Sequence, residues 1–123
     1  MKAASAGGGG TIAGASIGTQ GVDSRDFAAT PTRITWSTSN SATVAQGAEL
    51  VSDEITYTFN KTAVNGVHIY TTDRDFVYTG STPYGAYICY DSDATDRTMD
   101  TTGPVSGGDD NMMAVTKFEV YVP

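Results

Sequence analysis

Beyond residue 26, apolar and polar side chains alternate along several short runs of this chain. In the clearest run, Ile55, Tyr57 and Phe59 occupy every second position, with threonines between them. Since successive side chains of a β-strand point to opposite faces, this spacing gives each run one apolar face. The runs with this pattern are residues 32–38, 54–60, 67–72, 76–79, 84–90 and 112–122. The chain is therefore expected to fold as a series of short strands.

The composition also favours strands over helices. The chain has 14 glycines and 7 tyrosines, and it is rich in threonine, which suits a pleated surface. Lysine and glutamate, which build solvent-exposed helices, are scarce. The segment with the most helix-like spacing, residues 42–52, is short and contains Gly47. We therefore expect an all-β protein.

Turn residues separate the predicted strands. The pair Asn65-Gly66 is the strongest hairpin signal in the chain, and residues 80–83 read Gly-Ser-Thr-Pro. Six to eight short strands joined by such turns are typical of an antiparallel β-sandwich or a jelly-roll-like small barrel. A chain of 123 residues is long enough to bury a core of this kind.

The first 26 residues differ from the rest of the chain. They hold half of the glycines and no aromatic residue, and Ile12, Ile17 and Val22 are far apart. Such a segment buries too little apolar surface to offset its ordering entropy, so we expect an extended, Gly-rich N-terminal arm (residues 1–26) before a β-sandwich domain (residues 27–123). An arm of this kind orders when it docks on another chain. Its expected partner-binding residues are Gly7, Gly8, Gly9, Gly10, Thr11, Ile12 and Ile17.

Charge and the scarcity of two residue types exclude several classes of function. With 7 basic and 14 acidic residues, the formal charge is −7, which argues against nucleic-acid and anionic-membrane partners because both need a cationic surface. One cysteine forms no internal disulfide, and one histidine excludes a multi-histidine metal site. The paired acids and bases of most enzymes are also missing, so we expect a protein that is not an enzyme.

One short motif resembles the sequence around an enzyme's catalytic serine. Residues 14–18 read Gly-Ala-Ser-Ile-Gly, which matches the pattern around the nucleophilic serine of α/β-hydrolases. That turn needs a preceding strand, a following helix and a histidine–acid pair, and a chance match in a Gly- and Ser-rich segment explains it better. His68 and Cys89 are interpreted as a strand residue and a small buried apolar residue. A small hydrolase is the least favoured class.

An acidic segment is the candidate metal site. Asp91, Asp93 and Asp96 stand at short intervals, as carboxylates do in loops that hold Ca²⁺. The segment lacks the glycine and the glutamate that complete a calcium loop, so a solvated acidic loop without any cofactor is the competing interpretation.

The aromatic residues offer a candidate ligand site. Tyr87 falls on the face of run 84–90 that we expect to point outward, and exposed aromatic rings on β-sandwiches stack on sugars. The other aromatic residues of the strands are expected in the core.

These observations favour a structural protein of a virus particle, most simply a bacteriophage capsid decoration or cement protein. Its arm docks on neighbouring subunits of a large lattice, and repetition strengthens weak single contacts. We expect a homo-oligomer that is made in the host cytoplasm and found in the virion. The alternative is a carbohydrate-binding or adhesin-type β-sandwich at the cell surface, with Tyr87 and the acidic loop as its site and Ca²⁺ as a candidate aid.

Overall fold

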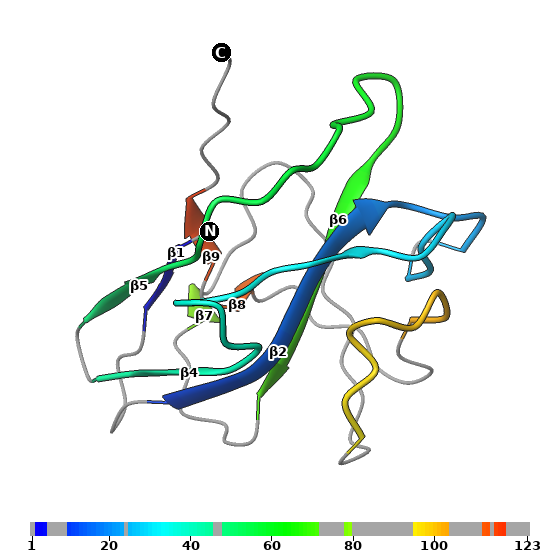
Figure 1. Cartoon of the computed structure of the whole chain (residues 1–123). Helices are drawn as coiled ribbons and strands as arrows, with labels where there is room; N and C mark the ends of the chain where they lie inside the picture. Colours follow the sequence, from blue (N-terminus) through cyan, green and yellow to red (C-terminus); the bar gives the residue numbers. More distant parts are fainter. Residues whose placement is uncertain are drawn as a thin grey trace.

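A computed structural model describes residues 2–4, 10–23, 25–45, 48–71, 78–79, 95–103, 112–113 and 115–117. Every element of secondary structure in this part of the chain is a β-strand (Figure 1). The strands are β1 (Lys2–Ala4), β2 (Gly10–Thr19), β3 (Thr32–Arg33), β4 (Ala42–Val44), β5 (Glu49–Val51), β6 (Asn65–Thr71), β7 (Tyr78–Thr79), β8 (Met112–Met113) and β9 (Val115–Lys117). The prediction of an all-β chain is confirmed for the described residues.

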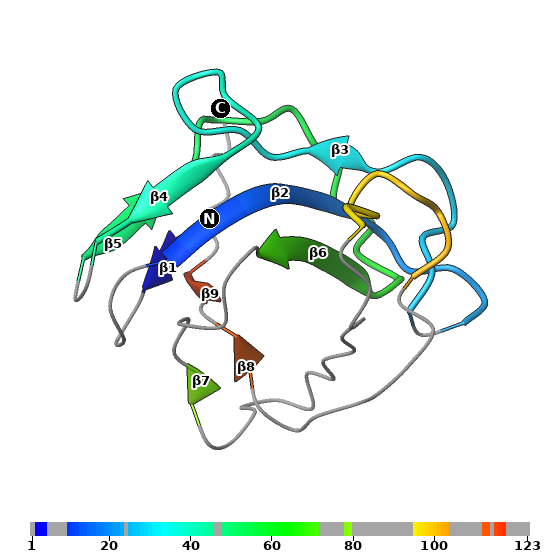
Figure 2. The same cartoon turned by 90° about the horizontal axis from the view of Figure 1, so that it is seen from below.

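The long strand β2 is the centre of the largest sheet. It pairs with β3 and β4 along one path and with β6 besides, and all of these pairings are antiparallel. Figure 2 shows β2 arching across the molecule between β3 and β6. A second sheet has the order β5-β1-β9, and β7 pairs with β8. The described strands do not close into a barrel.

An irregularity in β2 explains how its apolar residues reach one face. The pairing with β6 shifts register between Ile12 and Gly14. An extra residue of this kind moves the following side chains by one position, so residues an odd number apart can face the same side. Ile12, Ala15 and Ile17 are consequently all buried in one cluster.

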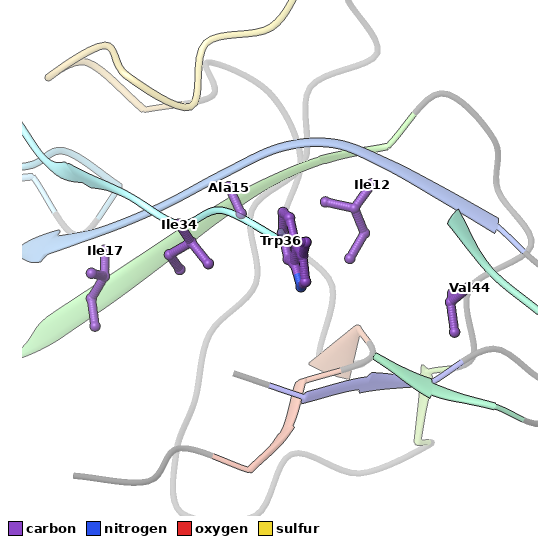
Figure 3. Packing of buried hydrophobic residues seen from close by; sticks show 6 residues of the cluster. All are labelled: Ile12, Ala15, Ile17, Ile34, Trp36 and Val44. Atoms are coloured by element: carbon purple, nitrogen blue, oxygen red, sulfur yellow. The ribbon is translucent and has the colours of Figure 1, made fainter. Parts of the chain in front are cut away.

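The core lies on one side of the β2 sheet. Its buried members are Ile12, Ala15, Ile17, Ile34, Trp36 and Val44, and Figure 3 shows these side chains on the same side of the ribbon. Leu50 of β5 and Val67 of β6 pack against them. The cluster therefore joins strands from both larger sheets.

The expected N-terminal arm is wrong over residues 10–19. These residues form the central strand, Ile12 and Ile17 are 1% and 3% exposed, and Gly10 is also buried. Thr11 pairs with Thr43 of β4. The entropy argument failed because strands on both sides supply the backbone hydrogen bonds and the apolar contacts that the segment lacks by itself. Gly7, Gly8 and Gly9 lie outside the described residues.

Several local predictions also need correction. Residues 54–60 do not join a sheet, and the turn expected at Asn65-Gly66 comes earlier, at residues 61–64, so that β6 begins at Asn65. The run 32–38 is a strand only at Thr32–Arg33. Residues 42–52, the segment with the most helix-like spacing, contain β4 and β5, in line with the all-β prediction. Residues 84–90 lie outside the described part of the chain.

Candidate functional site

The face of β2 opposite the core carries only small residues at alternate positions. These are Gly14, Ser16 and Gly18, and all three are buried. A Cβ atom on Gly14 would lie 2.7 Å from Asp96 Oδ2, and one on Gly18 would lie 2.6 Å from Phe27 Cδ1. Glycine is required here because the covering groups approach the backbone more closely than any side chain allows.

A polar cluster over Gly14 fixes residues 95–103 on this face. Asp96 Oδ1 accepts hydrogen bonds from the backbone N–H of Thr98 at 2.9 Å and from its hydroxyl at 2.6 Å. Arg33 Nη1 donates to Thr98 Oγ1 at 2.9 Å and lies 3.8 Å from Asp96 Oδ2. The segment is thus attached to the β2 sheet through charge-assisted bonds that β3 supplies.

Ser16 and His68 are opposite one another on β2 and β6. Ser16 is fully buried, and its hydroxyl donates to the carbonyl of Thr98. His68 Nε2 lies 3.0 Å from the carbonyl oxygen of Arg25, which only accepts, so Nε2 carries the proton. The two side chains therefore bind separate backbone carbonyls instead of each other. This arrangement does not activate Ser16 as a nucleophile.

The environment of His68 favours its neutral form. Its ring stacks on Phe27 with ring centroids 3.9 Å apart. Burial lowers the pKa of His68, although the hydrogen bond to Arg25 and the nearby Asp26 act in the opposite direction. Asp26 itself accepts a hydrogen bond from the backbone N–H of Gly103 at 2.9 Å. This histidine holds the 25–27 segment and the end of the 95–103 segment close to β6.

Of the three residues of the predicted calcium site, the structure describes only Asp96, so the site itself stays a prediction. The carboxylate of Asp96 already accepts hydrogen bonds from Thr98 and lies beside the guanidinium of Arg33. Asp91 and Asp93 lie outside the described residues. Within the part of the chain that the structure describes, no group of three or more metal-ligating side chains comes together. Tyr87, the predicted sugar-stacking residue, also lies outside it.

A strained hairpin is held by Asp53. Ser37 and Thr38 have φ angles of 50° and 67°, and Trp36 and Ser39 exchange both backbone hydrogen bonds across them. Asp53 accepts hydrogen bonds from the backbone N–H groups of Ser37 and Thr38, both at 2.8 Å. Together with the hydroxyl of Thr35, these bonds lower the pKa of Asp53. The carboxylate thus compensates a backbone conformation that costs on the order of 1–2 kcal/mol per residue.

The segment that follows Asp53 is the most unusual feature of the surface. Residues 54–59 belong to no strand, and within the described part of the chain their backbone N–H and C=O groups make no hydrogen bond. Glu54, Thr56 and Thr58 are exposed, whereas Ile55 and Tyr57 pack against the core cluster. We call residues 54–59 the unpaired segment.

A hollow of about 390 Å³ lies beside the unpaired segment. Tyr57 lines it from one side, and the end of β2 and the chain before β3 line the rest. The complete lining is Ile17, Gly18, Thr19, Ala28, Ala29, Thr30, Thr32 and Tyr57. The hydroxyl of Tyr57 donates to Asn65 Oδ1 at 2.7 Å, so the ring is fixed against β6.

The sequence alone did not point to the cluster of Arg33, Asp96 and Thr98, since Arg33 is far along the chain from the other two residues. The alternating Gly14, Ser16 and Gly18 could have indicated it, because small residues at every second position of a strand allow close approach of another segment. No protein-family model, curated protein or solved structure matches the chain. Among the described residues no helix is long and apolar enough to cross a lipid bilayer.

Proposed function

We propose that this chain is a structural protein that works by contact with other proteins in a larger assembly and not by catalysis. The unpaired segment is the observation that carries the proposal. Backbone groups at the edge of a sheet or in an isolated extended segment are a template for pairing with another chain. The arm that first suggested assembly no longer supports this function over residues 10–19, so the contact is assigned to the surface instead.

Within this class we propose a virion component, such as a bacteriophage capsid decoration protein made in the host cytoplasm. Composition supports this narrower proposal: the charge of −7 disfavours nucleic-acid and membrane partners, and a single cysteine means that no internal disulfide is needed. We also infer that the two larger sheets pack as a β-sandwich. Leu50 and Ala48, at β5, pack against the core cluster of the β2 sheet, which supports this arrangement.

The test is to follow the tagged protein in its native host by density-gradient fractionation, combined with hydrogen exchange. We expect it to sediment with assembled particles at a fixed stoichiometry, with slower amide exchange in residues 54–59 than in the free protein. Recovery only in the low-mass fraction would contradict the proposal. The exposed segment 40–41 serves as an internal control for exchange, because it lies outside the proposed contact.

A second candidate is carbohydrate binding, and the hollow favours it. One tyrosine ring and the threonines at positions 19, 30 and 32 line this space, and sugars are bound by a stacked ring together with hydroxyl partners. In this second proposal, Ca²⁺ bound at the acidic segment would assist sugar binding. Titration of isotopically labelled protein with a glycan panel, with and without calcium, tests it: shifts confined to the hollow and lost in Tyr57→Ala support it. Spectra that do not change would exclude it.

A further inference from the structure

We infer that the unpaired segment forms an antiparallel two-stranded ribbon with the same segment of a second copy of this chain. The inference rests on the proposed function, since it names the partner of the contact surface proposed there. It starts from the backbone groups of the segment, which make no hydrogen bond to any residue that the structure describes. The chain is anchored on both sides of it: Asp53 N–H donates to the Thr35 carbonyl at 2.8 Å, and the Asn60 carbonyl accepts from Asn65 Nδ2 at 3.1 Å.

Between these anchors, and among the described residues, the contacts that hold the segment in place are made by its side chains. Ile55 and Tyr57 pack against the core cluster, and the rings of Tyr57 and Phe59 meet edge to face with centroids 5.1 Å apart. Phe59 is still 38% exposed. The backbone is therefore extended and fixed before any partner arrives, which reduces the entropy that pairing costs.

The sequence of the segment is self-complementary in an antiparallel ribbon. A twofold axis through Tyr57 makes three further kinds of pair, namely Ile55 with Phe59, Thr56 with Thr58, and Glu54 with Asn60. Each apolar residue then meets an apolar residue and each threonine meets a threonine, and both are favourable cross-strand pairs. Moving the axis to Thr58 would place Ile55 opposite Lys61, so the axis through Tyr57 is preferred.

The charges favour this partner and direction. Asp53 and Glu54 stand at one end of the segment, and Lys61 follows the other end. Antiparallel pairing places the acidic end of one copy beside the basic end of the other, whereas parallel pairing would place like charges together. The net charge of −7 on each copy opposes association, and added salt screens both this repulsion and the attraction between the two ends.

Cysteine cross-linking tests both the pairing and its register. In a Cys89→Ala background, Thr56→Cys and Thr58→Cys are made in separate chains. Directly opposite residues of an antiparallel pair have Cα atoms about 4.5–5.5 Å apart, which is within the span of a disulfide. We expect a disulfide dimer in an equimolar oxidised mixture of the two variants and none in either variant alone. A mixture of Thr56→Cys with Thr43→Cys, an exposed residue of β4, is the matched control.

Sedimentation of the full chain provides the second measurement. We expect a monomer–dimer equilibrium that shifts to monomer in Thr58→Pro, with unchanged circular dichroism. A wild-type chain that stays monomeric from micromolar to millimolar concentration, or a mixture that cross-links no more than the control, would overturn the inference. Protection of residues 54–59 in assembled particles would then still support the proposed function with a different partner, so the two failures are distinguishable.

Discussion

Replacing Ile12 by alanine tests whether the glycine-rich start of the chain is a separate arm or part of the folded core, because only truncation of a core residue would lower the free energy of unfolding. Ile12 is 1% exposed and belongs to the core cluster. The change removes three buried carbon atoms, which at roughly 0.8 kcal/mol each is about 2.4 kcal/mol of lost transfer free energy. The unfilled cavity raises the expected loss in the free energy of unfolding to about 2–5 kcal/mol.

The assay is equilibrium urea denaturation followed by tryptophan fluorescence. Trp36 is the only tryptophan and is 4% exposed, so its emission reports the opening of the same core. With a mid-range dependence of about 2 kcal/mol per molar urea, Ile12→Ala should lower the midpoint by about 1–2.5 M. Because a domain of this size has only about 5–15 kcal/mol of stability, Ile12→Val, with an expected loss of about 0.5–1.5 kcal/mol, keeps the test interpretable.

The matched control is Val22→Ala. Val22 comes from the same glycine-rich stretch, but its side chain is fully exposed, so its truncation should change stability by less than about 0.5 kcal/mol. Equal midpoints for the Ile12 and Val22 variants would refute the central position of β2 and restore an arm that depends on a neighbour for its order.

Three further predictions concern the site and its supports. Gly14→Ala should cost about 1–3 kcal/mol and speed amide exchange in residues 95–103, because its Cβ would lie 2.7 Å from Asp96; Gly66→Ala, with a nearest contact at 3.5 Å, should be nearly neutral. Thr38→Gly should stabilise the protein by roughly 0.5–1 kcal/mol in thermal unfolding because it relieves a φ of 67°, whereas Thr43→Gly in β4 should destabilise it. The pKa of His68 in the folded protein lies below its ordinary 6.5, so the unfolded chain takes up the proton first as the pH falls. The contribution of His68 to the free energy of unfolding is therefore complete above pH 6.5. Below that pH the free energy of unfolding should decline by up to about 1.4 kcal/mol per pH unit. His68→Phe should remove this slope between pH 6.5 and the lowered pKa, and an unchanged slope would count against the assignment.

The sequence predicted the class of the fold better than its connections. Alternation correctly places Ile55 and Tyr57 toward the core, whereas Phe59, which the same spacing puts on that face, is 38% exposed. Whether an extended segment joins a sheet depends on which strand lies beside it, and the period does not carry that information. The ladder expected at 54–60 was therefore wrong, although exposed and partly buried residues do alternate over residues 54–58.

The central strand was missed for a different physical reason. The register shift between Ile12 and Gly14 breaks the alternation that marks a strand, and the glycines on its other face resemble those of a flexible segment. Those glycines serve close packing under Asp96 and Phe27, which are brought there by tertiary contacts. A local estimate of entropy does not include contacts made by residues so far along the chain.

The two corrections together change where the proposed partner would bind. Gly14, Ser16 and Gly18 of β2 are buried under residues of the same chain, and β6 pairs along residues 14–19, so this strand is held within its own fold. The backbone groups of residues 54–59 are in the opposite situation: they are extended, fixed by their side chains and exposed at alternate positions. Proteins that stay monomeric usually protect such a segment with proline, a bulge or a covering loop. In this chain the segment contains no proline and its only charge is Glu54, so its exposure is more readily explained by a contact surface than by a tolerated hazard.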